Sequence, residues 1–376
     1  MRVGLSSLLL VLALLAAGCG GGSSPSAPAA GEGGTGRADE GLQVPTADWK
    51  TDFAKHTVPL DEFQSGGPGK DGIPAIDHPH FVSVPQANEW LADREPVIEL
   101  DLGGTARAYP LQILIWHEIV NDAVVGTPVA VTFCPLCNTA LVFDRRLDRR
   151  TLDFGTTGNL RNSDLVMYDR QTETWWQQFG GAAVVGKLAG AQLRQLPARI
   201  VAWEDFAARH PDGEVLSRHT GFVRPYGQNP YTGYDNVDSP PFFGAANADD
   251  KRLPPKERVV YIERGDDAVA VPLSWLAQKK RVVVELGGER LEVVFTGTAS
   301  SALDSAAIAE GRQVGSAEVC SLTTGRLVPF DQPFWFAVAA FRPNVRIVGQ
   351  SVAVKAAAAE PPRTRKASTT GRFSTQ

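Results

Sequence analysis

The chain has 376 residues, which is enough for about two or three domains with a substantial buried core. Hydrophobic residues make up 43% and charged residues 21%, a composition that excludes a largely disordered, collagen-like or coiled-coil protein. The formal charge of -5 leaves no basic excess to neutralise phosphates, so we expect no nucleic-acid binding. The 4 cysteines are too few for a disulfide-stabilised scaffold.

The N-terminus predicts a secretory signal. Arg2 precedes an apolar run that ends near Ala17, and this run is shorter than the roughly 20 residues of a transmembrane helix. The segment Leu15-Ala16-Ala17-Gly18-Cys19 resembles a bacterial lipobox, whose cysteine receives lipid and becomes the mature N-terminus. An ordinary signal peptide with an unrelated cysteine is the alternative. We expect a signal over residues 1–18, lipid on Cys19 and a flexible Gly/Ser/Pro-rich tether over residues 19–45.

The folded part begins after this tether, with an approach segment over residues 46–94. Residues 96–99 and 106–109, joined by two glycines, predict a β-hairpin, and Pro110 begins a buried apolar helix that runs to about Val120. The remaining predicted elements are strands at 129–133, 140–144, 152–155 and 165–168, a helix over 203–209, and a disordered tail over 356–376.

The sequence contains an internal repeat, which predicts two similar modules. The hairpin and its following Pro-Leu recur, since Pro272 lies 162 residues after Pro110. We therefore predict an α+β, strand-rich fold of two similar β-hairpin/helix/sheet modules, over residues 95–240 and 241–355. Chance similarity of two such units is the alternative. Module one contains the unusual residues, because module two has Lys279 at the position of His117 and no Cys-x-x-Cys.

Three residues of module one form a candidate metal or redox site. Cys134 and Cys137 have the spacing that either closes a reversible disulfide or places two thiolates on one soft metal ion. With His117 they would form a three-ligand set that zinc or copper accepts, leaving one position open. Copper is slightly preferred, because thiolate and imidazole suit it in an oxidising compartment. The alternative is a hydrogen-bonded core histidine beside an inert disulfide or two buried thiols.

Other polar residues are predicted to support that site. On the predicted helix, His117 and Asn121 share one face, and Glu118 and Asp122 share the adjacent face. We expect Glu118, Asn121 and Asp122 to orient the ligands, because ligating imidazoles usually donate their second N–H to such groups. Two further residues join this supporting set, namely Asn138 and Met167. Met167 could be an axial copper ligand, although core packing is the commoner role of a single methionine.

Aromatic side chains predict a ligand pocket or a partner-binding surface. Adjacent tryptophans on a strand point to opposite faces, so one of Trp175 and Trp176 could enter a core while the other lines a pocket. The predicted pocket also includes residues of a Tyr/Asn/Gly/Pro loop, namely Tyr226, Asn229, Tyr231 and Tyr234. A linker held by tyrosine hydroxyls is the alternative for this loop.

Two other chemistries are less favoured. A thioredoxin motif should begin a helix, whose N-terminus lowers the pKa of the nucleophile, but the residues after Cys137 continue as a strand. A hydrolase with a cysteine nucleophile and His117 as base would need a free thiol outside the cytoplasm, where disulfides persist.

Several ordered motifs together resemble a known family, the bacterial and archaeal domain-of-unknown-function family 3179. The motifs are Asp71–Asp77, Tyr109-Pro110, Trp116–Asp122, Cys134–Thr139, Asn162–Arg170 and Asn229–Tyr234. The chain departs from the family pattern at Phe133, where tyrosine is usual, and at His78-Pro79-His80, where Asn-Pro-Lys is usual. The resemblance implies no activity.

These observations predict an exported, lipid-anchored protein of the bacterial cell envelope with a Cys/His metal-binding or thiol-redox site. A module that binds a small ligand or an envelope protein, with a structural disulfide, is the second hypothesis. The membrane, reached through the lipid on Cys19, is the one partner that the sequence names.

Overall fold

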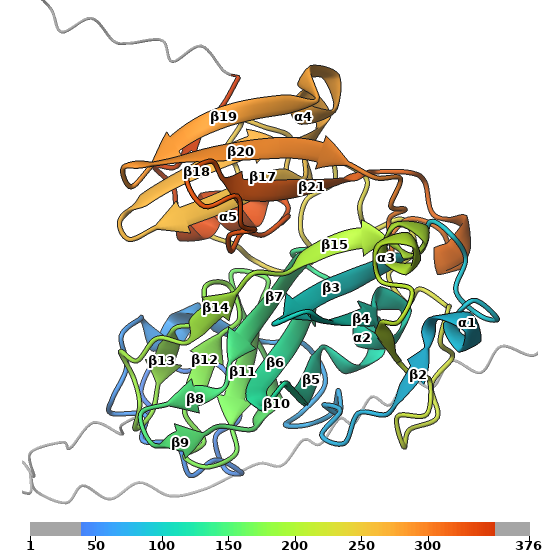
Figure 1. Ribbon diagram of the computed structural model, residues 1–376. Helices are drawn as coiled ribbons and strands as arrows, with labels where there is room; N and C mark the ends of the chain where they lie inside the picture. The colour runs from blue at the N-terminus through green and yellow to red at the C-terminus, as the bar shows by residue number, and fades with distance from the viewer. Residues whose placement is uncertain (1–38, 350–376) are drawn as a thin grey trace, which may run out of the picture. The chain divides into compact units, whose positions relative to one another are not determined.

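The computed structural model describes residues 39–349 (Figure 1). The predicted signal, Cys19 and the tail over residues 356–376 lie outside the described residues. The described chain is rich in strands and has few helices, as the sequence predicts. In this part of the chain, no helix has the length and apolar character needed to cross a membrane.

Three sheets are built mainly from the first half of the described chain. One has the strand order β1-β10-β11-β12-β13, with β1 at Phe63–Ser65, β10 at Phe154–Arg161, β11 at Asp164–Asp169, β12 at Trp175–Gln177 and β13 at Ala183–Val185. The second has the order β14-β7-β6-β5, with β14 at Arg194–Leu196, β7 at Thr139–Asp144, β6 at Thr127–Cys134 and β5 at Ile119–Val124. The third has the order β15-β3-β4-β16-β2, with β15 at Arg199–Ala202, β3 at Pro96–Leu102, β4 at Thr105–Pro110, β16 at Glu214–Leu216 and β2 at Phe81–Ser83.

The later strands form two smaller sheets. One contains β17 at Val259–Arg264, β18 at Asp267–Pro272 and β22 at Arg346–Ile347, and the other contains β19 at Arg281–Leu286, β20 at Glu289–Thr296 and β21 at Ser316–Ser321. A short ribbon pairs β8 at Arg146–Leu147 with β9 at Arg150–Thr151. The helices are α1 at Val84–Ala87, α2 at Leu111–His117, α3 at Trp203–Arg209, α4 at Leu273–Lys279 and α5 at Trp335–Phe341, and two 3-10 turns lie at Leu60–Glu62 and Ile308–Glu310.

Helix α2 ends earlier than its apolar pattern predicts. The backbone N–H of Glu118 donates to Leu114 O, and Glu118 adopts φ 58° and ψ -30°, which turns the chain out of the helix. The next residues form β5, which pairs with β6, so Asn121 and Asp122 lie on a strand and share no helix face with His117 or Glu118. The predicted helix to Val120 is therefore wrong in its last turn, because the β5–β6 hydrogen bonds take these residues.

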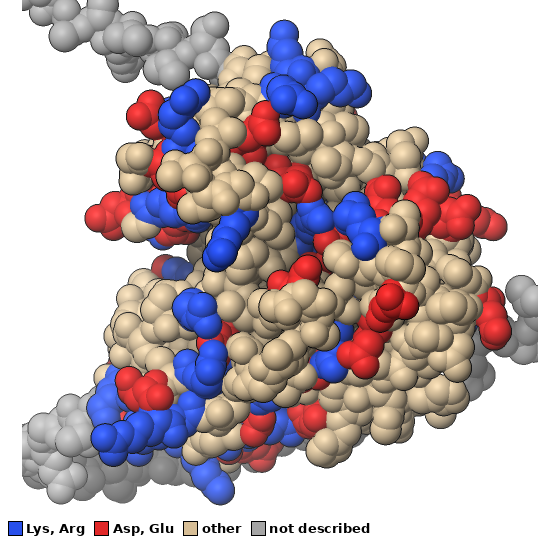
Figure 2. Space-filling model, viewed as in Figure 1, with Lys and Arg blue, Asp and Glu red and all other residues tan. Residues whose placement is uncertain are grey.

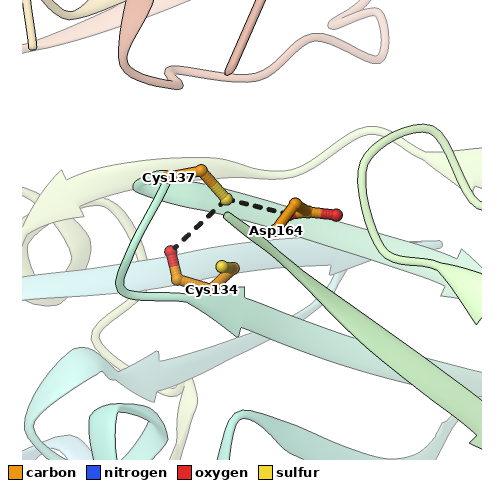
Figure 3. A group of neighbouring side chains, drawn as sticks. All are labelled: Cys134, Cys137 and Asp164. Atoms are coloured by element: carbon orange, nitrogen blue, oxygen red, sulfur yellow. Dashed lines mark hydrogen bonds between the residues drawn. The ribbon is translucent and has the colours of Figure 1, made fainter. Parts of the chain in front are cut away.

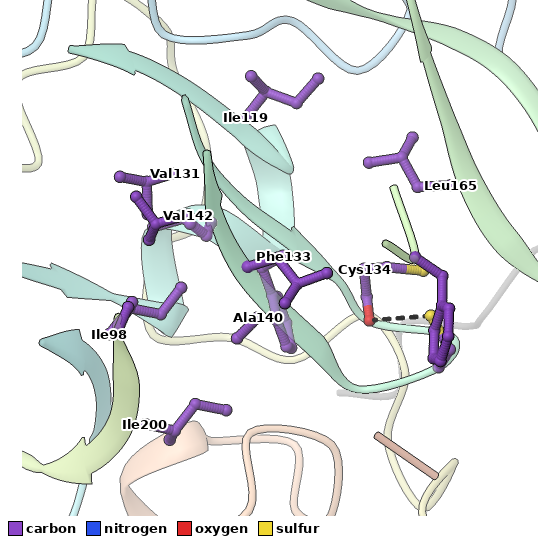
Figure 4. Close-up of a cluster of buried hydrophobic side chains, with 14 of the residues drawn as sticks. Ile98, Ile119, Val131, Phe133, Cys134, Ala140, Val142, Leu165 and Ile200 are labelled. Atoms are coloured by element: carbon purple, nitrogen blue, oxygen red, sulfur yellow. Dashed lines mark hydrogen bonds between the residues drawn. The ribbon is translucent and has the colours of Figure 1, made fainter. Parts of the chain in front are cut away.

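The largest core lies around β6 and β7 (Figure 4). All six residues from Val129 to Cys134 are buried, so this strand is covered on both faces. Its neighbour β7 is buried along its whole length. Such two-sided burial explains the continuous apolar run that predicts a strand over 129–133. The chain therefore delivers Cys134, at the end of β6, into the centre of the core rather than to its surface.

Two stretches of the chain have the same element order and spacing. The bounds of β18, α4, β19 and β20 each lie 162 residues after those of β4, α2, β5 and β6. In both stretches the second hairpin strand has a parallel partner that follows a later helix, since β16 pairs with β4 and β22 with β18. The stretches diverge after β6 and β20: β6 turns at once into β7, whereas β20 is followed by a connection over residues 297–315 before β21 begins.

Gly158, on β10, packs closely against the backbone of Pro68. Gly158 has φ +75°, and a Cβ placed there would lie 1.9 Å from Pro68 O. We expect Gly158→Ala to lower the free energy of unfolding by at least about 3 kcal/mol, because a backbone clash adds to the left-handed strain.

Gly126 is the matched control. It has φ +71° but no atom within 4 Å of an added Cβ, so Gly126→Ala should cost about 1–2 kcal/mol. Urea unfolding of the two variants measures the difference, and equal losses would contradict the predicted contact between Gly158 and Pro68.

Candidate metal centre

The two neighbouring cysteines lie in the turn between β6 and β7. Cys134 is the last residue of β6, and β7 begins at Thr139, so the four-residue motif is a tight connection within one hairpin. Asn138 has φ 57°, a left-handed conformation that asparagine adopts more readily than most residues. Both cysteines are free thiols and are buried.

Asp164 completes a group of three potential ligands with these thiols (Figure 3). It is the first residue of β11 and follows Asn162 and Ser163, which both have positive φ values of 55° and 58°. Cys137 Sγ donates to Asp164 Oδ1 at 2.8 Å. One ligand atom from each of Cys134, Cys137 and Asp164 lies within 4.8 Å of the others.

Hydrogen bonds from a neighbouring strand end fix the aspartate. Asp164 Oδ2 accepts from the backbone N–H of Phe179 at 2.8 Å and from the side-chain amide of Gln177. On the other side of the group, Cys137 Sγ lies 3.2 Å from Thr139 Oγ1, which donates to Gln178 Oε1 at 2.5 Å. The carboxylate is therefore held in place by β12 and the residues after it.

The acidic groups around this site have raised pKa values. Burial raises the pKa of the Cys134 thiol, and the pKa of Cys137 lies well above its usual range for the same reason. Burial also raises the pKa of Asp164 to about 6. Burial and the charge of Asp164 raise the pKa of Glu118 to about 8. None of the hydrogen bonds of Asp164, Cys134 or Cys137 within residues 39–349 comes from a lysine or arginine.

A bound cation would reverse these shifts, because it favours the charged form of a carboxylate or thiolate. Clustered acids with raised pKa values, held by aligned hydrogen bonds, are typical of functional sites. In the absence of a cation, the buried thiols are neutral and weak nucleophiles.

The second half of the chain contacts this turn directly. Asp331 Oδ1 accepts from the backbone N–H of Ala140 at 3.0 Å, and Asn138 Nδ2 donates to Gln332 O at 2.8 Å. The backbone N–H of Phe334 donates to Cys137 O at 2.8 Å. Asp331 Oδ2 is buried and has no hydrogen-bond partner within the described chain, and burial raises the pKa of this carboxyl to about 7.

His117 does not belong to this group. Its Nδ1 lies 2.7 Å from Pro74 O, and its Nε2 lies 2.7 Å from Tyr226 Oη. Both ring nitrogens therefore have partners on other segments, and the group within 4.8 Å contains Asp164 instead. The three side chains that could hold a metal ion together are therefore Cys134, Cys137 and Asp164 rather than the predicted Cys2His set.

The predicted supporting residues divide into two groups. Glu118 and Asn138 lie at the site, since the charge of Glu118 raises the pKa of Cys134 and Asn138 follows Cys137. Asn121 and Asp122 do not: Asn121 bonds to Asp77 and to the backbone of Phe154, and Asp122 bonds to Arg107 and Tyr109.

Met167, Trp175 and Trp176 are buried side chains of the sheet that contains β11 and β12. Met167 is fully buried and stands opposite Trp176 in the β11–β12 register, and its predicted role as a ligand stays a prediction. Trp175 and Trp176 enter two different hydrophobic clusters, which confirms that they face opposite sides. Both side chains are fully buried, and their predicted role in a ligand pocket stays a prediction.

The tyrosines of the predicted pocket lie at two separate places, one at His117 and the other at the cysteine turn. Tyr226 bonds to His117 and Thr220. Tyr234 donates its hydroxyl to Leu136 O at 2.8 Å, inside the cysteine turn, and burial raises the pKa of Tyr231, with smaller contributions from the charges of Glu118 and Cys134. The irregular loop therefore covers the thiols.

The remaining residue of that loop, Asn229, organises its backbone. Its Oδ1 accepts from the Tyr231 N–H at 2.8 Å, and its Nδ2 donates to Ser305 O at 3.0 Å. Asn229 therefore holds the backbone of the loop, and its predicted role in a ligand pocket stays a prediction.

Sequence reasoning missed Asp164 and Asp331. Asp164 gave a signal, because a carboxylate directly before the apolar strand residues 165–168 must be paired when that strand is buried. Asp331 lies 194 residues after Cys137 and gave no comparable signal.

The chain belongs to a family whose proteins have no assigned function. The family model described as "Protein of unknown function (DUF3179)" matches residues 70–345. This confirms the resemblance found in the sequence motifs, and the matched span includes both cysteines, Asp164 and Asp331. No curated protein and no solved structure shows significant similarity to the chain.

The raised pKa values predict how stability depends on pH. Glu118 has a folded-state pKa of about 8, above its ordinary value, so the unfolded chain loses this proton at lower pH than the folded chain does. The free energy of unfolding of metal-free protein should fall as pH rises from about 5 to 8, by about 1.4 kcal/mol for each unit of pKa shift.

The variant Glu118→Gln cannot ionise there and should flatten this decline. Glu285→Gln, at an exposed position on β19, is the matched control and should leave the decline unchanged. Urea unfolding in the presence of a chelator at several pH values measures both slopes. A stability that rises over this range, or a slope unaffected by Glu118→Gln, would contradict the assignment.

Proposed function

We propose that this protein binds a single metal ion through Cys134, Cys137 and Asp164. The observation that supports this most strongly is the close group of three buried ligands, whose atoms lie within 4.8 Å of one another and accept no hydrogen bond from a lysine or arginine of residues 39–349. Two thiols and a carboxylate without a counter-charge are costly in a hydrophobic core, and coordination offsets that cost.

Zinc is the metal we favour. Zinc accepts thiolate and carboxylate ligands together, whereas copper(I) selects soft sulfur ligands. The replacement of the predicted imidazole by a carboxylate therefore moves the preference from copper to zinc. Three protein ligands leave a fourth position, which is the arrangement of catalytic rather than structural zinc sites.

A thiol-redox function is the second candidate. It is supported by the Cys-x-x-Cys spacing within one turn, and an exported protein would meet oxidising conditions. The raised pKa values of both thiols disfavour it, because the thiolate is the reactive form in disulfide exchange. The hydrolase hypothesis is weaker still, because His117 bonds elsewhere and no other histidine bonds to either thiol within the described chain.

We also infer that the two equally spaced stretches descend from one repeated module. The shared 162-residue offset of β4, α2, β5 and β6 supports this, as does the left-handed backbone at both Glu118 and Lys280. The backbone turn is therefore common to both stretches, whereas the carboxylate and the cysteines are particular to the first.

The proposed location is the bacterial cell envelope, with lipid on Cys19. The Leu-Ala-Ala-Gly-Cys segment supports it, together with the Gly/Ser/Pro-rich residues that follow.

Metal analysis tests the centre. Protein purified without nickel-affinity chromatography should hold about one equivalent of zinc. The variants Cys137→Ser and Asp164→Asn should each weaken zinc binding by more than about 100-fold, since each removes a direct ligand. Competition with a chromophoric chelator measures the affinity.

Two variants serve as controls for that experiment. His117→Ala and Cys320→Ser should bind zinc as the wild type does, because neither residue belongs to the group. Loss of metal from His117→Ala with retention in Asp164→Asn would reinstate the imidazole ligand. Tighter binding of copper(I) than of zinc would reject the zinc preference, and a Cys134–Cys137 disulfide in metal-free native protein would favour redox function.

Membrane fractionation tests the anchor. In a bacterial host, wild-type protein should partition with membranes and incorporate labelled fatty acid, and Cys19→Ser should abolish the label because the acylated thiol is gone. Label on the Cys19→Ser protein would reject the lipobox, and Cys320→Ser is the control that should keep the label.

A further inference from the structure

A cavity beside the proposed centre has the features of a ligand site. It has a volume of about 360 Å³, which is within the usual range for small-molecule pockets. Most of its lining residues come from the segment β12 to β14 and from the ends of β17 and α5. Figure 2 shows a hollow between these two regions, edged by both basic and acidic side chains.

Two arginines, Arg161 and Arg342, line this cavity. Arg161 donates through Nε to Glu62 at 2.6 Å, and Arg342 pairs with Glu263. Each guanidinium has five N–H groups in a planar fork. Arg161 Nη2 and Arg342 Nη1 make no hydrogen bond within the described chain, so each arginine keeps a donor for a ligand. Such donors match the oxygens of a carboxylate.

Two aromatic rings line the cavity. Phe179 and Phe341 both line it and stack on each other, with ring centroids 4.6 Å apart. The guanidinium carbon of Arg161 lies 5.5 Å from the Phe341 ring centroid. A ligand with an acidic group at the arginines would place an apolar body over these rings.

A chain of hydrogen bonds joins the cavity to the proposed centre. Arg161 Nη1 donates to Gln177 Oε1 at 3.3 Å, and the Gln177 amide donates to Asp164 Oδ2. Phe179, which lines the cavity, donates its backbone N–H to the same oxygen. A ligand that engages Arg161 therefore acts on a residue two hydrogen bonds from the aspartate.

From this arrangement we propose that the cavity binds a small organic carboxylate with a flat apolar body, of which benzoate is the simplest probe. The carboxylate bonds to Arg161 and Arg342, and the ring packs on Phe179 and Phe341. This deepens the proposed function, because the ligand lies beside the metal centre, but binding itself does not require the metal.

Calorimetric titration with benzoate tests the proposal. Arg342→Gln should weaken benzoate binding by about tenfold or more, because a charge-assisted hydrogen bond is lost. Benzamide, which is uncharged, should bind weakly to wild type and to Arg342→Gln alike. Arg281→Gln, which removes an exposed pair with Glu292 on β19, is the matched control and should bind benzoate as wild type does.

Other outcomes separate the two proposals. Asp164→Asn should lose zinc and retain benzoate; if wild type binds benzoate without binding zinc, the metal centre fails and the cavity site stands. No benzoate binding to wild type, or equal binding to wild type and Arg342→Gln, would overturn the cavity site. Stronger binding of inorganic phosphate than of benzoate would overturn the carboxylate class.

Discussion

The contact between Cys137 Sγ and Asp164 Oδ1 is the interaction around which this part of the fold is arranged. It joins the end of one hairpin turn to the first residue of a strand in another sheet, and it does so where neither side chain reaches water. An ionisable pair of this kind is unfavourable in a core unless every remaining polar group is satisfied. Thr139, Gln177 and the Phe179 backbone satisfy these groups.

The same constraint explains why distant segments converge on one turn. The left-handed residues Asn162 and Ser163 aim the aspartate at the sulfurs, and the tyrosine loop closes the other side through Tyr234. Residues 331–334 bond to the backbone of the turn from the second half. Exclusion of water strengthens each electrostatic interaction inside and disfavours the charged forms, so the pKa values of both thiols and of Asp164 are raised in the metal-free protein.

The sequence predicted what depends on local pattern. The strands at 129–133 and 140–144, the helix over 203–209 and the closeness of Cys134 to Cys137 follow from hydrophobic periodicity and spacing, and the structure has them. His117 was placed wrongly because a helix pattern cannot reveal that Glu118 leaves the helix with φ 58°. Asp331 could not be predicted, because its contact with Ala140 depends on how the two halves pack.

The bond between Asn138 and Gln332 spans 194 residues, and this separation has a consequence for the order of folding. In a chain that emerges from its N-terminus, the cysteine turn is present long before the segment that closes over it. The contacts of residues 331–334 with the turn therefore form only after nearly the whole described chain has emerged, so this side of the centre is completed late in folding.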